Sequence, residues 1–263
     1  MKKLALFLAL ALLLTAALGA EALAAEGKTV ASGKFGKLKW KLTELPDEDG
    51  EYCGACLLTI SGKGRMEDLK WNKTDSCWAD PPWVRQDDDD DDGYWIEKVV
   101  IKKGVTSIGS GVFADQDDIT AVTIPEGVTS IGQYAFSFCS SLEDVTIPKS
   151  LKTVGEGAFW ECTMLAEDGF IIVSSILFEY VGFSREVTIP EGVTRIEPSA
   201  FESNEYVQRV TIPESVRRIG ECAFDDCDKL TFIYFAGSRE KWEKVKLRED
   251  AIPESVSVAC ADD

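Results

Sequence analysis

Cys53 and Cys56 have the spacing of a redox-active dithiol, with two residues between them. Dithiol oxidoreductases place such a pair where a strand turns into a helix, whereas this pair is expected inside β structure. A local disulfide, or a pairing that involves Cys77, is therefore favoured over catalysis. A zinc site is not expected either, because it needs four ligands and the chain has no histidine.

The run Asp87–Asp92, followed by Gly93, is the strongest charge feature of the chain. From Asp88 onward it matches D-x-D-x-D-G, the start of an EF-hand loop, but position 12 of that loop falls on Val99 instead of a glutamate. Acidic runs are normally solvated loops that extend by self-repulsion. A solvated loop is therefore favoured, with weak, non-specific Ca²⁺ association as the alternative.

The chain has 46 acidic and 28 basic residues among 263, a formal net charge of −18. Such a field repels nucleic acids and anionic membrane surfaces, so neither is expected as a partner. The lack of histidine removes the commonest general base. Acidic pairs such as Asp225 and Asp226 fall in turns, with no converging pocket. The sequence thus predicts no catalytic residue, no metal ligand, no cofactor and a protein that is not an enzyme.

Residues 1–24 read as a secretory signal peptide of bacterial style. Two lysines precede the apolar run Leu4–Leu18, and small residues follow, with a cleavage site at Ala24 or earlier at Ala20. An uncleaved membrane anchor is the alternative, but the run is short for a span. The expected product is exported, with no stable membrane insertion after cleavage.

A repeat with a period of 23 residues dominates the rest of the chain and must position any site. The period relates Ile101, Ile124 and Ile147, then Phe113, Phe136 and Phe159, and later Ile189 and Ile212. Five units are recognisable, and an irregular unit at about residues 166–186 interrupts them before the phase resumes. Fixed periods of this length indicate solenoids.

Each unit reads as a short strand followed by a turn and a compact second half. Val122 and Ile124 face inward, Thr123 faces outward, and Pro125 ends the strand because it cannot donate to a ladder. A repeat glycine permits a turn, and Phe136 packs inward from a short helical or 3₁₀ segment. One unit buries little by itself, so stacking is required to form a continuous core.

The stretch VTIPEGVTSIGQYAFSFCSSL, Val122 to Leu142, resembles the repeat of the BspA-type leucine-rich repeat family of bacterial surface proteins. Ser32–Glu44 and Leu57–Met66 are similar to that family's N-terminal β cap, and Phe232–Leu247 to its closing strand and helix. The resemblance covers nearly the whole chain after the signal peptide. It implies a β-rich leucine-rich-repeat solenoid of strands and short helical or 3₁₀ turns, capped at both ends.

The expected domains are a signal peptide (1–24), a Trp-rich β cap (25–95), a solenoid (96–230) and a C-terminal cap (231–263). Caps are needed because the open ends of a solenoid expose apolar core and strand edges. In the C-terminal cap, Ser238 is expected to be the N-cap of a helix that carries Trp242.

Five tryptophans concentrate in the N-terminal cap: Trp40, Trp71, Trp78, Trp83 and Trp95. They either fill the core of a small β domain or form a surface on which sugars stack, and the core is favoured. Cys139, Cys162 and Cys227 each lie three residues after a repeat phenylalanine. They are expected to be small buried side chains, with a disulfide between Cys139 and Cys162 as the alternative.

The outward residues of the strands, with their flanks, form the candidate ligand-binding surface, because the strand face of a leucine-rich repeat is wide and rigid. Threonine at any one position is also explained by β propensity and contacts between threonines. The candidate ligand-binding residues are Val100, Thr123, Asp144, Thr146, Lys149, Glu186, Thr188, Arg209 and Thr211.

The functional hypothesis is an exported, non-enzymatic leucine-rich-repeat protein that mediates protein–protein or cell-surface adhesion through this strand face. The resemblance implies a host or neighbouring-cell surface protein, or a polysaccharide, as partner. The expected location is secreted or extracellular, or associated with the cell surface. The alternative function is carbohydrate binding through the Trp-rich cap.

Overall fold

The computed structural model describes residues 27–46, 52–72, 77–84 and 94–263. The expected signal peptide, residues 1–24, and the run Asp87–Asp92 lie outside the described residues. The chain forms two compact units: unit 1 extends to Ala158, and unit 2 is Phe159–Asp263. This division falls inside residues 96–230, the stretch that is predicted to be one solenoid.

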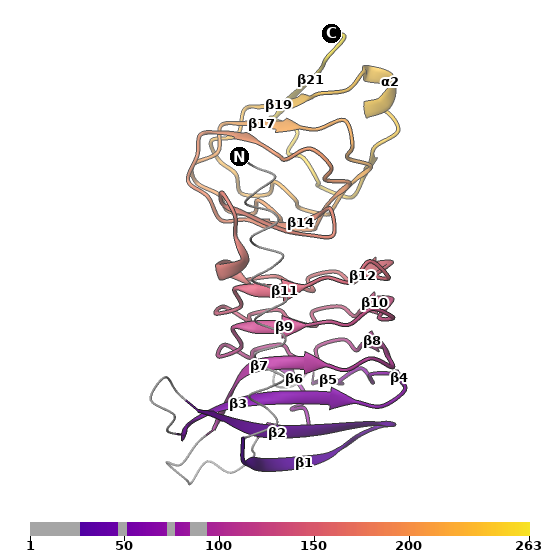
Figure 1. Ribbon diagram of the computed structural model, residues 1–263. Helices are drawn as coiled ribbons and strands as arrows, with labels where there is room; N and C mark the ends of the chain where they lie inside the picture. Colours follow the sequence, from indigo (N-terminus) through magenta and orange to yellow (C-terminus); the bar gives the residue numbers. More distant parts are fainter. Residues whose placement is uncertain (1–26, 47–51, 73–76, 85–93) are drawn as a thin grey trace, which may run out of the picture. The chain divides into compact units, whose positions relative to one another are not determined.

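Unit 1 contains a six-stranded sheet in which a hairpin-like N-terminal part leads into parallel repeat strands (Figure 1). Its strands are, in spatial order, β1 (Thr29–Phe35), β2 (Leu38–Pro46), β3 (Tyr52–Ser61), β7 (Trp95–Ile101), β9 (Ala121–Thr123) and β11 (Asp144–Thr146). The pairs β1–β2 and β2–β3 are antiparallel, whereas β3, β7, β9 and β11 are parallel. The N-terminal β cap thus continues the sheet of the repeats.

The second half of each coil in unit 1 supplies a strand to another parallel sheet. This sheet contains β4 (Gly64–Arg65), β8 (Val105–Ile108), β10 (Ser130–Ile131) and β12 (Thr153–Val154). A small two-stranded sheet joins β5 (Trp71–Asn72) to β6 (Cys77–Trp78). Register follows the period, since Val122 pairs with Val145 and Ser130 with Thr153.

The inward positions form the core that the period predicts. Val122, Ile124 and Phe136 are buried, and the rings of Phe113 and Phe136 stack with centroids 5.1 Å apart and planes 6° apart. These two rings therefore pack on each other from one coil to the next, as in a solenoid.

The segment around each repeat phenylalanine is a pair of tight turns instead of a helix. Residues two before and two after the phenylalanine have left-handed backbone angles, as in Tyr134 (φ 53°) and Phe138 (φ 58°) around Phe136. A right-handed helix cannot pass through such residues. In the repeats that the structure describes, regular helix is confined to a single 3₁₀ turn, η1 (Thr163–Leu165).

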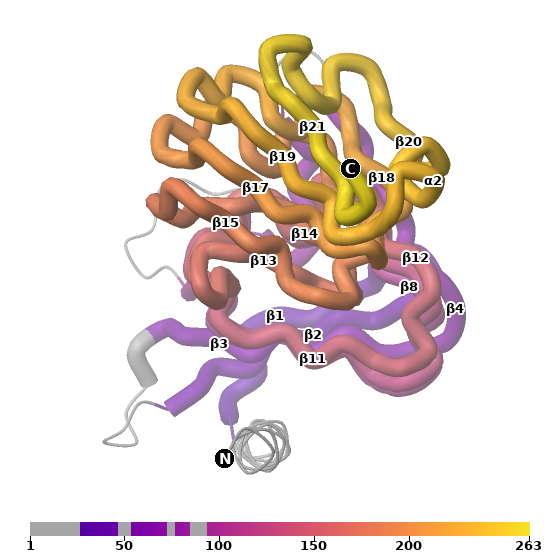
Figure 2. The backbone as a smooth tube through the Cα atoms, turned by 90° about the horizontal axis from the view of Figure 1, so that it is seen from above, coloured from indigo at the N-terminus to yellow at the C-terminus, as the bar shows by residue number. Residues whose placement is uncertain are grey.

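Unit 2 repeats the two-sheet arrangement. One sheet has the order β13 (Phe170–Val173), β14 (Ile176–Tyr180), β16 (Arg195–Ile196), β18 (Arg218–Ile219) and β20 (Lys246–Leu247). The other has the order β15 (Glu186–Thr188), β17 (Arg209–Ile212), β19 (Phe232–Phe235) and β21 (Ser257–Cys260), and Figure 2 shows these four strands side by side. The expected closing helix is α2 (Arg239–Trp242), where the Ser238 hydroxyl accepts a hydrogen bond from the Lys241 amide.

The irregular unit is the antiparallel hairpin β13–β14. This hairpin also accounts for Glu197, which occupies the position that is glycine in the other coils, such as Gly220. An added Cβ at Gly220 would lie 2.2 Å from the backbone nitrogen of Pro198, in the coil before it. The coil before Glu197 is the hairpin, and there a buried carboxylate fits and pairs with Arg195 at 2.6 Å.

The cysteines give a correction and a confirmation. Cys56 and Cys77 are free thiols, contrary to the expected disulfide, because Cys56 points into the core while Cys77 is exposed. The side chain of Cys53 lies outside the described part of the structure. In the column, Cys227 is buried as expected and donates its thiol hydrogen to the Phe201 carbonyl at 2.9 Å.

We expect alkylation to distinguish these thiols. Burial raises the pKa of Cys56 and of Cys227 to about 11. At pH 8 only about one molecule in a thousand then carries the thiolate that reacts. Iodoacetamide should modify Cys77 in the native protein and reach Cys56 and Cys227 only in denaturant, as read by peptide mass spectrometry. Equal native labelling of Cys227 and Cys77 would contradict this burial.

Candidate functional site

The strand face of unit 2 is built by the register of β15, β17, β19 and β21. One outward column contains Glu186, Arg209 and Phe232, which pair across neighbouring strands. The next column contains Thr188, Thr211 and Tyr234. Four candidate residues, Glu186, Thr188, Arg209 and Thr211, therefore lie together on one sheet.

The same columns contain two aromatic residues, Phe232 and Tyr234, that are absent from the candidates predicted from the sequence. Tyr234 is 36% exposed, and the Arg209 guanidinium lies 5.6 Å from the ring centroid of the half-buried Phe232. The signal was available, because position 234 is 23 residues after Thr211. It was missed because FIYF was assigned to the closing cap and not to the strand column.

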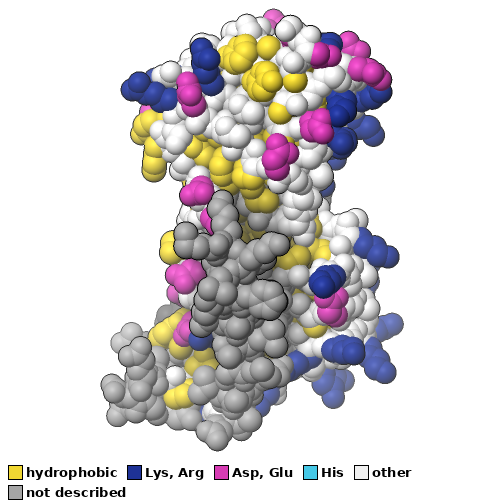
Figure 3. Space-filling model, turned by 45° about the horizontal axis from the view of Figure 1, so that its top comes forward, with side chains coloured by type: hydrophobic (Ala, Val, Ile, Leu, Met, Phe, Trp, Pro, Cys, Tyr) yellow, Lys and Arg dark blue, Asp and Glu magenta, His cyan; other side chains and the backbone are white. Residues whose placement is uncertain are grey.

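A second pair of aromatic residues borders this face. Phe183 lies three residues before Glu186, and Tyr206 lies three residues before Arg209. Phe183 is 75% exposed, and its ring packs edge-to-face on that of Tyr206 at 5.1 Å. The Lys229 ammonium lies 5.9 Å from the Tyr206 ring centroid. Figure 3 shows hydrophobic side chains in patches on the face of unit 2 that it presents, with acidic side chains at their margins. We refer to five of these residues together as the aromatic strand face: Phe183, Tyr206, Arg209, Phe232 and Tyr234.

The unit 1 candidates lie on and beside a different sheet, and most of them are half-buried. Thr123 and Thr146 pair with each other and are half-buried, as is Asp144. Burial raises the pKa of the Asp144 carboxyl. Lys149 is exposed, and its backbone amide donates to the Glu126 carboxylate at 3.0 Å, which lowers the pKa of Glu126.

Val100 does not have the exposure that its position suggested. It pairs with Thr123 in the outward column but is only 4% exposed, in an apolar cluster with Leu45, Ala55 and Leu57. Val100 packs on Leu45, Ala55 and Leu57, which are apolar residues of the N-terminal strands. The expectation that it is presented to a ligand is therefore corrected.

The tryptophans of the cap divide between core and surface. Trp40 and Trp83 are buried, as the core interpretation predicts. Trp71 is 49% exposed and Trp95 is 38% exposed, and Trp71 packs edge-to-face on Trp78 at 5.3 Å. They do not form one continuous platform.

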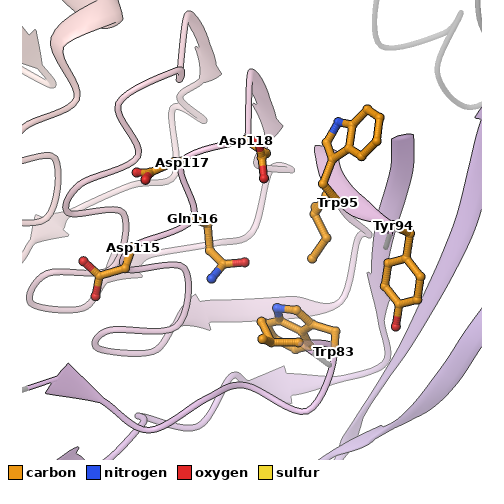
Figure 4. Close-up of a pocket in the computed structure, with 9 residues that line it drawn as sticks. Trp83, Tyr94, Trp95, Asp115, Gln116, Asp117 and Asp118 are labelled. Carbon is orange, nitrogen blue, oxygen red and sulfur yellow. The ribbon is translucent and has the colours of Figure 1, made fainter. Parts of the chain in front are cut away.

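A cavity of about 330 Å³ lies in unit 1 beside Trp83 (Figure 4). The cap supplies Trp83 and Val84, the start of β7 supplies Trp95 and Ile96 next to Tyr94, and the turn after Phe113 supplies four polar residues. The full lining is Trp83, Val84, Tyr94, Trp95, Ile96, Asp115, Gln116, Asp117 and Asp118. Burial and the charge of Asp117 raise the pKa of Asp115.

A second hollow of about 600 Å³, over β1 to β3, has the opposite charge. Its lining includes Lys34, Lys39 and Lys41, with the hydroxyls of Thr59 and Ser61. Figure 3 shows Lys and Arg side chains along one edge of unit 1. Charge is therefore segregated in this acidic protein.

The repeats decide which family the protein belongs to. Residues 93–170 and 171–248, more than half of the chain, match the model of the BspA type leucine rich repeat region. The chain belongs to the BspA-type leucine-rich repeat family. The resemblance seen in the repeat sequence and the predicted solenoid are both confirmed. A search of curated proteins finds no significant match.

Three solved bacterial structures are similar to this BspA-type protein. A leucine-rich repeat protein from Eubacterium ventriosum is 22% identical, with 78% of this chain and 73% of that one covered and a TM-score of 0.36. The T. pallidum leucine rich repeat protein is 19% identical, with 82% of each chain covered and a TM-score of 0.32. A leucine rich cell surface protein from Faecalibacterium prausnitzii is 16% identical, with 83% and 98% covered and a TM-score of 0.24. These likenesses do not bear on what the protein binds.

Two findings concern the described part of this BspA-type chain alone. It has no cluster of three or more cysteine and acidic side chains arranged to hold a metal ion. It also has no helix long and apolar enough to cross a membrane.

Proposed function

We propose that this BspA-type protein is an exported, non-enzymatic binding protein, and that its aromatic strand face docks a protein on a host or neighbouring cell. The single observation that carries the proposal is the pairing of the exposed Tyr234 with Thr211, and of the half-buried Phe232 with Arg209, across β17 and β19.

The composition of this face supports a protein partner. Tyrosine, phenylalanine and arginine are enriched in the centres of protein interfaces, and tyrosine and arginine among the residues that dominate binding energy. Here Arg209 already lies against Phe232, so its side chain loses less freedom when a partner arrives.

The backbone beneath the face supports the proposal as well. Parallel pairing joins β15, β17, β19 and β21 across the whole sheet, so the outward side chains keep a regular spacing. A rigid surface costs little conformational entropy on binding. The unit 1 residues Thr123, Asp144, Thr146 and Lys149 stay predicted contacts, and bulky substitutions there would test them separately.

A binding experiment tests the aromatic strand face. Purified protein would be titrated, by biolayer interferometry, against surface proteins of candidate host and neighbouring cells. For a partner so found, Tyr234→Ala and Arg209→Ala should each weaken binding by about 10- to 100-fold, the effect of losing an interface hot spot.

Two exposed residues of the other sheet serve as matched controls. Leu247→Ala and Arg248→Ala remove an apolar and a cationic side chain at and beside β20 and should leave the affinity within about twofold, as expected of residues outside an interface. If Tyr234→Ala and Arg209→Ala behave like these controls, the proposal is wrong.

A further inference from the structure

The cavity beside Trp83 has a rigid aromatic floor. Trp83 is 1% exposed, and its ring stacks on Phe113 at 5.6 Å and meets Phe35 edge-on at 5.4 Å. Contacts on both sides hold this ring in one orientation. A ligand would therefore meet a surface that is already formed.

This floor carries a hydrogen-bond donor without an acceptor. The indole Nε1–H of Trp83 is buried and has no partner among the residues that the structure describes. Figure 4 shows this nitrogen on the side of the ring that faces Gln116 and Asp118. A buried donor left unpaired is unfavourable, so an arriving oxygen atom that accepts from it would gain affinity.

The rim supplies mainly acceptors. Asp115, Asp117 and Asp118 accept hydrogen bonds when ionised, and Gln116 both donates and accepts. In Figure 4 the Gln116 amide points toward Trp83 and Asp118 lies between Gln116 and Trp95, whereas the carboxylates of Asp115 and Asp117 point away from the aromatic residues. A fitting ligand must therefore present several donors and at least one acceptor.

The remaining wall is aromatic and partly open to solvent. Trp95 is 38% exposed and lines the cavity together with the half-buried Tyr94. Aromatic faces contact apolar C–H groups, and tyrosine adds a hydroxyl at its edge. The volume of about 330 Å³ is at the lower end for small-molecule sites, which span roughly 300–1,000 Å³.

We infer that this cavity binds one uncharged sugar ring, a neutral hexose or N-acetylhexosamine, alone or as part of a neutral polysaccharide. Each sugar hydroxyl both donates and accepts, so one ring can give hydrogens to Asp118 and Gln116 and accept one from Trp83.

Two other ligand classes fit less well. Sialic, uronic or sulfated sugars are repelled by the three carboxylates of the rim. An ammonium group is attracted by those carboxylates and by the rings, but it has no lone pair to accept from the indole nitrogen. The inference does not depend on the proposed protein-binding face, because every lining residue belongs to unit 1.

An array of neutral, N-acetylated, sialylated and sulfated oligosaccharides would test this site with the purified protein. Neutral or N-acetylated glycans should bind, and titration of the best one should change the tryptophan fluorescence. Trp95→Ala and Asp118→Asn should each weaken that binding at least tenfold, since each removes a group that lines the cavity.

The chain offers a matched control for each variant. Trp71→Ala removes an exposed tryptophan of the same cap outside the cavity lining, and Asp228→Asn removes one negative charge in a turn of unit 2. Both should bind like the unchanged protein. Thermal unfolding of every variant shows whether the fold is retained. If Trp95→Ala proves unstable, Asp118→Asn still tests the site, because Asp118 is exposed and its replacement removes no buried packing.

Three results would overturn the inference. The first is that no neutral or N-acetylated glycan binds. The second is that the bound glycan is insensitive to both Trp95→Ala and Asp118→Asn. The third is that binding is confined to acidic glycans, which would favour the lysine-lined hollow over β1 to β3.

Discussion

Replacing Phe136 by alanine is expected to lower the free energy of unfolding of unit 1 by about 3–5 kcal/mol, the usual cost of removing a buried phenylalanine. The ring is fully buried, and it stacks on Phe113 at 5.1 Å. In a solenoid each coil is held by its neighbours, so the cavity would weaken the contacts on both sides of the coil. Urea denaturation followed by circular dichroism measures the change.

Phe138 provides the control because it lies two residues further on and is exposed. Phe138→Ala should cost no more than about 1 kcal/mol, since little apolar area leaves the core. Equal losses for the two variants would show that the phenylalanine column does not dominate the stability of this unit.

Replacing Gly220 by alanine is expected to destabilise unit 2 by about 3 kcal/mol, at the upper end for overpacking. The added Cβ would lie 2.2 Å from the nitrogen and 2.6 Å from the Cα of Pro198. Both atoms belong to the backbone of the preceding coil, so no side-chain rotation relieves the contact. The midpoint of urea denaturation, with the slope unchanged, reports the loss.

Gly192 separates crowding from backbone conformation. It has φ +91° and nothing within 4 Å of an added Cβ, whereas Gly220 is not among the residues with positive φ. Gly192→Ala should cost about 1–2 kcal/mol, from the left-handed conformation alone. If it costs as much as Gly220→Ala or more, close approach of the coils is not the reason for the repeat glycine.

The repeat glycine can be recognised from the sequence, but its physical role differs from the one that the sequence suggests. A glycine at a fixed place in each unit was interpreted as permitting a turn. Gly132 has no positive φ, and an added Cβ there would lie 2.4 Å from the Ser110 backbone nitrogen. The turns are made instead by residues such as Tyr134 and Phe138, and neither residue type predicts a left-handed backbone angle.

The sequence by itself determined the family, the period, the inward and outward positions of each strand and the N-cap of the closing helix. These follow from spacing along the chain, because side chains alternate in a strand and stacked coils repeat at one interval. The candidate threonine columns follow in the same way, since Thr188 and Thr211 are one period apart.

Only the tertiary structure decided which of these positions are presented. Val100 is in the outward column yet only 4% exposed, whereas Tyr234, one period after Thr211, is 36% exposed. The cavity beside Trp83 is lined both by the N-terminal cap and by the turn of the first repeat that contains Asp118. Exposure and cavities depend on contacts between segments far apart in sequence, and no local pattern encodes those contacts.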